Sequence, residues 1–135
     1  MDSSLVYLRE LSGTLFRYHQ ENFLCDVVIV TAEQSELRAH SVVLASVSSK
    51  LRAAFEQSNS ANVKKNYLFR LHLADCDAAV LEILLQYIYT GTILLYTQLT
   101  MDIINNVILA SQKLGLDMTK IVACIGVMLQ LAGVT

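Results

Sequence analysis

The sequence predicts an α+β domain that is predominantly helical. Apolar residues recur at three- and four-residue intervals in five segments, which is the spacing of one face of a helix. Three shorter runs, rich in β-branched or alternating apolar residues, predict strands. The chain has 135 residues and no proline, and no repeat or low-complexity tract divides it. We therefore expect residues 1–135 to form a single domain.

The first segment predicts a helix over residues 5–16. Ser3 or Ser4 is expected to cap it, because a serine hydroxyl accepts a hydrogen bond from the unpaired N–H groups at the start of a helix. The residues at helical spacing are Leu5, Leu8, Leu11, Leu15 and Phe16, and further apolar residues off this stripe are Val6, Tyr7 and Tyr18. The helix is therefore apolar on more than one side.

The remainder of the first half predicts two strands and a helical segment. Residues 25–30 form a β-branched run that is typical of a strand buried on both faces, and residues 37–39 are expected to return as a short second strand. The apolar spacing over residues 41–55 is helical, with room for one break near Ser48 and Ser49. Residues 56–66 are polar and predict a solvated loop.

The second half begins with a strand predicted over residues 67–73. The next helix is expected to start at Asp75 or Asp77 and to end at Gly91, because glycine adopts the left-handed conformation that stops a helix without steric cost. A short extended piece is expected at residues 92–95.

Two further helices complete the prediction. Thr100 is expected to cap a helix that ends at Gly115, and Asp117 begins the last helix. Residues 121–134 are the most hydrophobic stretch of the chain. Because this stretch is short of the roughly 20 residues that a membrane span needs, we expect a buried helix and no membrane partner.

The composition favours association with other protein chains. Hydrophobic residues make up 54% of the chain and charged residues only 16%, whereas roughly a quarter of an ordinary globular domain is charged. A domain of this size cannot cover so much apolar surface by itself. Contiguous uncovered apolar surface usually marks a partner site, so we expect an oligomer.

Charge and cysteine content restrict partners and compartment. The net charge is −2 and the basic residues are scattered, so no basic stripe predicts direct contact with nucleic acid. The three cysteines, Cys25, Cys76 and Cys124, are an odd number and far apart, and the first residues do not resemble a secretory leader. We expect free thiols in an intracellular, reducing compartment.

Signatures of cofactor and metal chemistry are missing from the sequence. It contains neither glycine-rich nucleotide motif and neither C-x-x-C nor H-E-x-x-H. Cys25, Asp26 and His40 are the parts of a cysteine nucleophile, its base and an orienting group. Small buried cysteines and histidines bonded to backbone are far more common. We therefore expect no enzyme and no cofactor.

Two other groupings have structural explanations that we prefer. His72 and Cys76 could supply two metal ligands, but a structural zinc site needs four. Tyr87, Tyr89 and Tyr96 could stack on bases, but the basic groove that accompanies such platforms is missing from this segment. We expect an outward histidine, a cysteine in the first turn of a helix, and tyrosines packed in the core or an interface.

Three segments resemble, in order and in spacing, the successive signatures of a BTB/POZ domain. They are FLCDVVIV at residues 23–30, RAHSVVLAS at residues 38–46 and LLQYIYTG at residues 84–91. The resemblance runs from about Ser3 to Leu131 and is greatest to the domains that open zinc-finger transcription factors. It implies a helical cluster edged by short strands, at the N-terminal part of a longer protein.

The resemblance also implies a homodimer built largely through the first helix. We carry the dimer role onto Leu5, Leu8, Leu11 and Leu15, although each could instead belong to the core of its own chain. Family members have a charged pocket in the interface, where the aspartate of C-D-V faces a basic residue just after A-H. Asp26 matches the aspartate, but the second position is Ser41. An unpaired buried carboxylate is costly, so Asp26 is expected to accept hydrogen bonds from Ser41 and backbone N–H groups.

Two uses of the family remain open for this chain. The first is a module that pairs the chains of a nuclear transcription regulator with themselves, with another BTB chain or with a co-regulator. Only about three residues precede the first helix, so we expect no full strand exchanged between subunits, and assembly beyond the dimer through a sheet edge stays open.

The alternative is a substrate adaptor for a cullin ubiquitin ligase. Adaptors commonly carry a hydrophobic-x-Glu element, and no glutamate lies between Gln57 and Leu68. The contiguous AHSVVLA segment argues against an ion-channel tetramerisation domain, which shares the fold.

Overall fold

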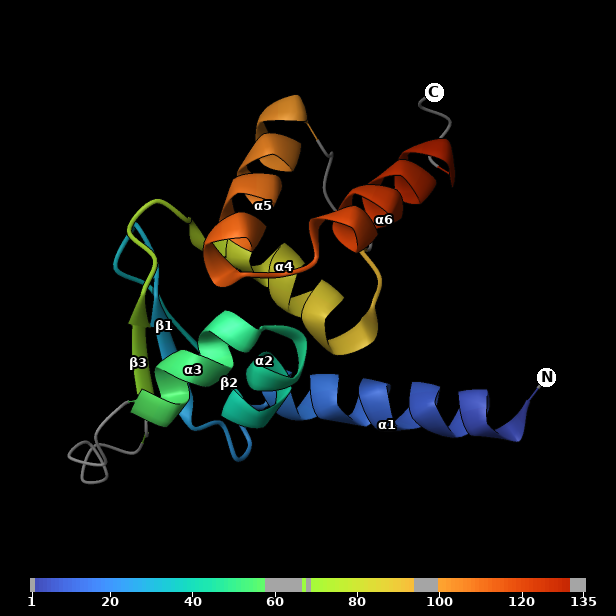
Figure 1. Cartoon of the computed structure of the whole chain (residues 1–135), viewed down its shortest axis with the longest axis horizontal. Coiled ribbons are helices and arrows are strands. Elements are labelled where there is room, and N and C mark those ends of the chain that lie inside the picture. Colours follow the sequence, from blue (N-terminus) through green and yellow to red (C-terminus); the bar gives the residue numbers. More distant parts are fainter. Residues whose placement is uncertain (1, 58–66, 68, 94–99, 132–135) are drawn as a thin grey trace.

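A computed structural model describes residues 2–57, 67, 69–93 and 100–131 of the chain. Within these residues, helices cluster around a small three-stranded sheet (Figure 1). In chain order the elements are α1 (Ser3–Gln20), β1 (Val27–Val30), β2 (Glu36–Ala39), α2 (Ser41–Val47), α3 (Ser49–Gln57), β3 (Phe69–His72), α4 (Ala78–Thr90), α5 (Met101–Leu114) and α6 (Met118–Leu131). The predicted α+β class, predominantly helical, is confirmed.

The sheet has the order β2-β1-β3, so that β1 is central. It pairs with β2 in the antiparallel and with β3 in the parallel direction. Side chains alternate between the two faces of a strand, and one face of β1 joins the main core through Val27 and Ile29. On the other face, Val28 and Val30 are only 1% and 3% exposed. The predicted burial of this strand on both faces is confirmed.

An ion pair between β3 and β2 lies across the second face of β1. Arg70 on β3 lies opposite Val28, and Glu36 on β2 lies opposite Val30. Their ion pair, with Arg70 Nη1 at 3.1 Å from Glu36 Oε2, therefore crosses β1. The aliphatic stems of such long side chains shield apolar surface while their heads stay in water.

Helix α4 is the centre of the core. It lies between α1 and the pair formed by α5 and α6 (Figure 1). Its side chains Leu81, Leu84 and Leu85 are fully buried, because apolar residues at three- and four-residue intervals face more than one neighbouring helix. Asp77 caps α4 by accepting a hydrogen bond from the N–H of Val80, and Gly91 ends it in the left-handed conformation.

Ser48 separates α2 from α3, as the sequence predicts, and joins both to the end of α5. Its hydroxyl donates to the carbonyl of Leu114 (2.5 Å) and accepts from the N–H of Leu51 (3.0 Å). The ammonium of Lys50 donates to the carbonyl of Lys113 (2.7 Å). Two of the carbonyls that a helix leaves unpaired at its C-terminus are thus satisfied by the start of α3.

Several predicted boundaries are confirmed and others are wrong by a few residues. Thr100 caps α5 and Gly115 ends it. The cap of α1 is Asp2, whose carboxylate accepts from the N–H of Ser4, and not a serine. Of the two predicted starts of α4, Asp77 is confirmed, and Asp75 pairs with Lys113 instead.

The remaining differences concern the strands, the polar loop and the last helix. Two strands are shorter than predicted, because β1 begins at Val27 and β3 spans Phe69–His72. Strand β2 begins one residue earlier than predicted, at Glu36. Helix α3 includes the first two residues of the predicted loop, and residues 58–66 of that loop lie outside the described residues. Residues 94–95 of the predicted extended piece and residues 132–134 of the predicted last helix also lie outside them. Helix α6 buries Ile121 and Ile125, but Val122 and Val127 are each 51% exposed. The helix that was expected to be buried is therefore buried on one face and exposed on the other.

Candidate interaction surface

Four leucines form one stripe along α1, and the rest of the chain covers only its end. Leu15 is half-buried and packs against the core, whereas Leu5, Leu8 and Leu11 are 56%, 55% and 44% exposed. The N-terminal half of α1 extends past the other elements (Figure 1). Three of the four predicted interface leucines therefore lie together on one exposed surface, which we call the α1 stripe (Leu5, Leu8 and Leu11).

The C-terminal half of α1 is held by α4 and β2. The hydroxyl of Ser12 donates to the carbonyl of Tyr89. The rings of Phe16 and His19 pack against the ring of Tyr89, with centroids 6.1 and 4.9 Å apart. Nδ1 of His19 donates to the carbonyl of Arg38 (2.8 Å). Sequence patterns do not predict these anchors, because the partners are far apart in the chain and share no local spacing.

Tyr89 also organises the start of α2. Its hydroxyl lies 2.5 Å from Nδ1 of His40 and accepts from the backbone N–H of His40 (3.0 Å). Nε2 of His40 lies 2.8 Å from the carbonyl of Phe23. All three contacts are satisfied when Nε2 carries the proton and Nδ1 accepts from the hydroxyl. Burial raises the pKa of Tyr89, so the hydroxyl stays neutral and able to donate.

We expect Tyr89→Phe to lower the free energy of unfolding by about 1–3 kcal/mol, because it leaves the buried N–H and Nδ1 of His40 without their partner. Urea denaturation followed by circular dichroism measures the change. Tyr87→Phe is the matched control, since this half-buried tyrosine makes no hydrogen bond through its hydroxyl within the described residues. An equal loss in both variants would contradict a role for this network.

Burial of His19 predicts a pH dependence of stability. Burial lowers the pKa of its imidazole below 6.5, although the hydrogen bond to Arg38 opposes the shift. Neutral His19 makes its full contribution to the free energy of unfolding when the pH is above the pKa of the unfolded chain. This contribution is lost as the pH falls towards the lower pKa of the folded chain, because the unfolded chain binds the proton more readily. We expect the melting temperature to fall between pH 7.5 and 5.5 in differential scanning calorimetry. His19→Gln, which keeps an N–H donor, should show a shallower fall, and an identical pH slope would contradict the assignment.

Asp26 and Ser41 are brought together as predicted. One carboxylate oxygen of Asp26 accepts from the N–H of Ser41 (2.7 Å), and the other accepts from its hydroxyl (2.5 Å). Because charge-assisted bonds to two donors stabilise a half-buried carboxylate, Asp26 needs no basic partner within its own chain. The place of these two residues in a dimer interface stays a prediction.

The hypothetical cysteine nucleophile lacks the geometry of one. The thiol of Cys25 lies 3.7 Å from Nε2 of His40, but that nitrogen is directed to the carbonyl of Phe23. Asp26 bonds to Ser41 rather than orienting His40. Burial raises the pKa of the Cys25 thiol, which disfavours the reactive thiolate. The arrangement fits the structural explanation.

The residues considered as metal ligands are also explained by the fold. Cys76 is buried, and burial raises the pKa of its thiol to about 11. Asp75 forms an ion pair with Lys113, and Asp77 caps α4. His72 is exposed on β3. In the part of the chain that is described, no three histidine, cysteine, aspartate or glutamate side chains gather as a metal site would require.

The tyrosines do not form the stacking platform that was considered. Tyr89 is buried with its ring against His19, and Tyr87 is half-buried beside the core. Tyr96 lies outside the described residues. Among the described helices, none combines the length and apolarity that crossing a membrane requires.

Comparisons with known proteins agree with the fold. A family model of the BTB/POZ domain matches residues 15–125. Human Kelch-like protein 2 is 35% identical over 118 residues, which cover 87% of this chain and 18% of that protein. Kelch repeat and BTB domain-containing protein 2 of Pongo abelii is 33% identical over 87 residues, covering 64% of this chain and 13% of that protein. The chain spans less than a fifth of the length of these relatives.

A solved structure shows the same architecture. The BTB domain of zebrafish PATZ1 superposes with a TM-score of 0.65 at 20% sequence identity, covering 92% of each chain. At this identity the likeness shows the fold. Because the family model matches most of the chain and the fold agrees, the chain belongs to the BTB/POZ family.

Proposed function

We propose that this BTB domain, a protein–protein interaction module, pairs with a second copy of itself through the α1 stripe. The observation that carries the proposal is that α1 has no buried residue although leucines recur along it. The row of leucines on α1 begins at Leu15, which packs against the chain's own core, and continues as the exposed α1 stripe from Leu11 to Leu5. A partner that covers the α1 stripe would bury the part of this row that the chain itself leaves exposed.

A second copy is the simplest partner for this surface. Most soluble oligomers are symmetric dimers, in which the same patch of both subunits meets. Tyr7, which lies four residues before Leu11 and therefore beside it on the helix, is exposed as well, and contiguous apolar surface of this kind usually marks an interface. The low charge content of the chain, 16%, supports the same conclusion.

The biological role would follow from pairing two larger chains. Dimerisation raises the effective concentration of whatever segments are attached to each domain. We propose a nuclear transcription regulator as the parent protein, in line with the resemblance to domains of zinc-finger factors. DNA contact would then belong to other segments, since this domain has a net charge of −2 and scattered basic residues.

An adaptor for a cullin ubiquitin ligase is the second candidate. The observation in its favour is the identity of 33–35% with kelch-type proteins. Against it stands the lack of glutamate between Gln57 and Leu68. A pull-down of the purified domain with the N-terminal part of a cullin scaffold separates the two roles, and tight binding would reverse our order.

The mass in solution tests the self-association itself. Size exclusion with light scattering over a range of protein concentrations should give twice the chain mass of 15.0 kDa at micromolar concentration. A monomer at every concentration would overturn the proposal. A tetramer would show that an additional interface exists beside the α1 stripe.

A further inference from the structure

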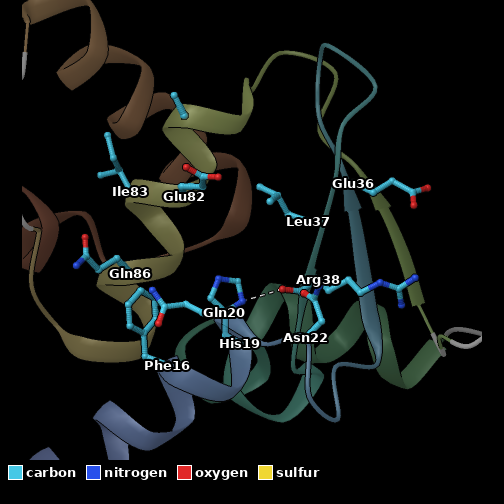
Figure 2. A pocket seen from close by; sticks show the side chains of 11 residues that line it. Phe16, His19, Gln20, Asn22, Glu36, Leu37, Arg38, Glu82, Ile83 and Gln86 are labelled. Carbon is cyan, nitrogen blue, oxygen red and sulfur yellow. Dashed lines mark hydrogen bonds between the residues drawn. The ribbon is translucent and has the colours of Figure 1, made fainter. Parts of the chain in front are cut away.

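A groove of about 770 Å³ lies at the C-terminal end of α1 (Figure 2). Its walls are the end of α1, strand β2 and the outer side of α4. The volume is within the range of about 300–1,000 Å³ that is usual for ligand sites. The groove differs from such sites in having a rim of charged and amide side chains, which favours a polar chain over a small apolar molecule.

The groove follows the edge of β2 rather than a face of the sheet. Three consecutive residues, Glu36, Leu37 and Arg38, line it, whereas the side chains of one sheet face come from alternate residues. In Figure 2 the side chain of Leu37 points towards α4, and those of Glu36 and Arg38 point away from the groove. A cavity that touches all three residues must border the strand's backbone, and β2 is the outer strand in the order β2-β1-β3.

Backbone groups of β2 face this groove. The N–H of Thr31, just after β1, donates to the carbonyl of Ser35, just before β2, so the backbone groups of Ser35 point towards β1. Along an antiparallel strand, the backbone groups of successive residues point alternately towards and away from the neighbouring strand. The backbone groups of Glu36 and Arg38 therefore point away from β1. The carbonyl of Arg38 indeed accepts from His19 of α1.

The side chains around the groove define what it would accept. Phe16, Leu37 and Ile83 are half-buried and offer an apolar floor. Glu82 on α4 lines the groove and makes no hydrogen bond or ion pair within the described residues. Glu36 is already paired with Arg70. The side chain of Arg38 also borders the groove but points away from it (Figure 2). The charge that points into the groove is therefore the carboxylate of Glu82.

We propose that this groove binds an extended segment of a partner protein, which pairs with β2 as an added strand and places a lysine or arginine beside Glu82. An apolar side chain of the same segment would rest on Phe16 and Ile83. Strand addition supplies affinity through main-chain hydrogen bonds, and the alternate side chains supply specificity. The chemistry that recognises the partner is a basic, alternately apolar peptide.

Three pools of fluorescent ten-residue peptides test the proposal by anisotropy on the whole chain. Each pool alternates random apolar residues with one fixed residue, which is lysine, glutamine or glutamate. We expect the lysine pool to bind best and the glutamate pool least. Glu82→Lys should weaken the binding of the lysine pool roughly fivefold, which is the upper effect of an exposed ion pair. Glu10→Lys, the same charge change on exposed α1, is the matched control and should leave binding unchanged.

Methylation of backbone nitrogens separates strand addition from side-chain binding. N-methyl groups on every second residue of the tightest peptide should reduce its affinity about tenfold in one register, where they remove donors to β2, and little in the other. Amide signals of residues 36–38 should shift on binding. Equal binding of the lysine and glutamate pools, equal effects of the two methylation registers, or no binding of the lysine pool would each overturn the proposal. Shifts confined to the α1 stripe would overturn it as well.

Discussion

Replacing Leu8 or Leu11 by glutamate is expected to convert the proposed dimer into a monomer. Both side chains are about half exposed in the single chain and would be buried by a second copy. Burying a fully exposed leucine is worth about 1.5–3 kcal/mol, so burying the exposed half of each side chain is worth about half of that, and a symmetric dimer loses this contribution twice. The loss of about 1.5–3 kcal/mol weakens the dimer roughly ten- to a hundredfold, and the buried carboxylate adds to it. Light scattering over a concentration series measures the change.

Val6→Glu is the matched control on the same helix. Val6 is 38% exposed and lies two residues before Leu8, about 200° around the helix, on the other side from the stripe. It introduces the same charge and should leave the mass of the dimer unchanged. Circular dichroism should show that all three variants are folded. If Val6→Glu dissociates the dimer while Leu8→Glu does not, the interface lies on the opposite side of α1.

Local patterns were sufficient to predict most elements. Thr100, Gly91 and Gly115 mark helix ends through side-chain and backbone chemistry that depends on neighbouring residues only. The hydrogen bonds from Ser41 to Asp26 were predictable because the resemblance to BTB/POZ domains places these two residues opposite each other, and a buried carboxylate without a basic partner must find donors nearby.

Contacts between distant segments could not be predicted from these patterns. The bond from Ser12 to Tyr89 joins residues 77 positions apart, and His40 meets Tyr89 across 49. Helical periodicity shows that a face is apolar, but it does not say whether the chain itself or a partner covers it. Leu15 and Leu8 share one stripe in the sequence, yet the structure buries only the first against the core. The groove beside β2 was likewise missed, because it depends on which strand lies at the edge.

Gly115→Ala is expected to be among the most destabilising single-methyl additions in the chain. Gly115 ends α5 at φ +74°, and its N–H and that of Leu116 bond back to the carbonyls of Gln112 and Ser111. A Cβ built at this residue would lie 2.9 Å from Cβ of Lys50 and 3.1 Å from Oγ of Ser48. The left-handed conformation costs alanine about 1–2 kcal/mol, and the enforced shift of α3 adds about 1–3 kcal/mol. Urea denaturation should therefore show a loss of about 2–5 kcal/mol.

Gly91→Ala separates the two causes of that loss. Gly91 ends α4 at φ +76°, but a Cβ there would meet no atom within 4 Å. It should lose only the conformational part, about 1–2 kcal/mol. The difference between the two variants measures how firmly Ser48 and Lys50 hold the end of α5 against the start of α3. Equal losses would mean that this junction yields easily, and that the hydrogen bonds of Ser48 and Lys50 contribute little to its rigidity.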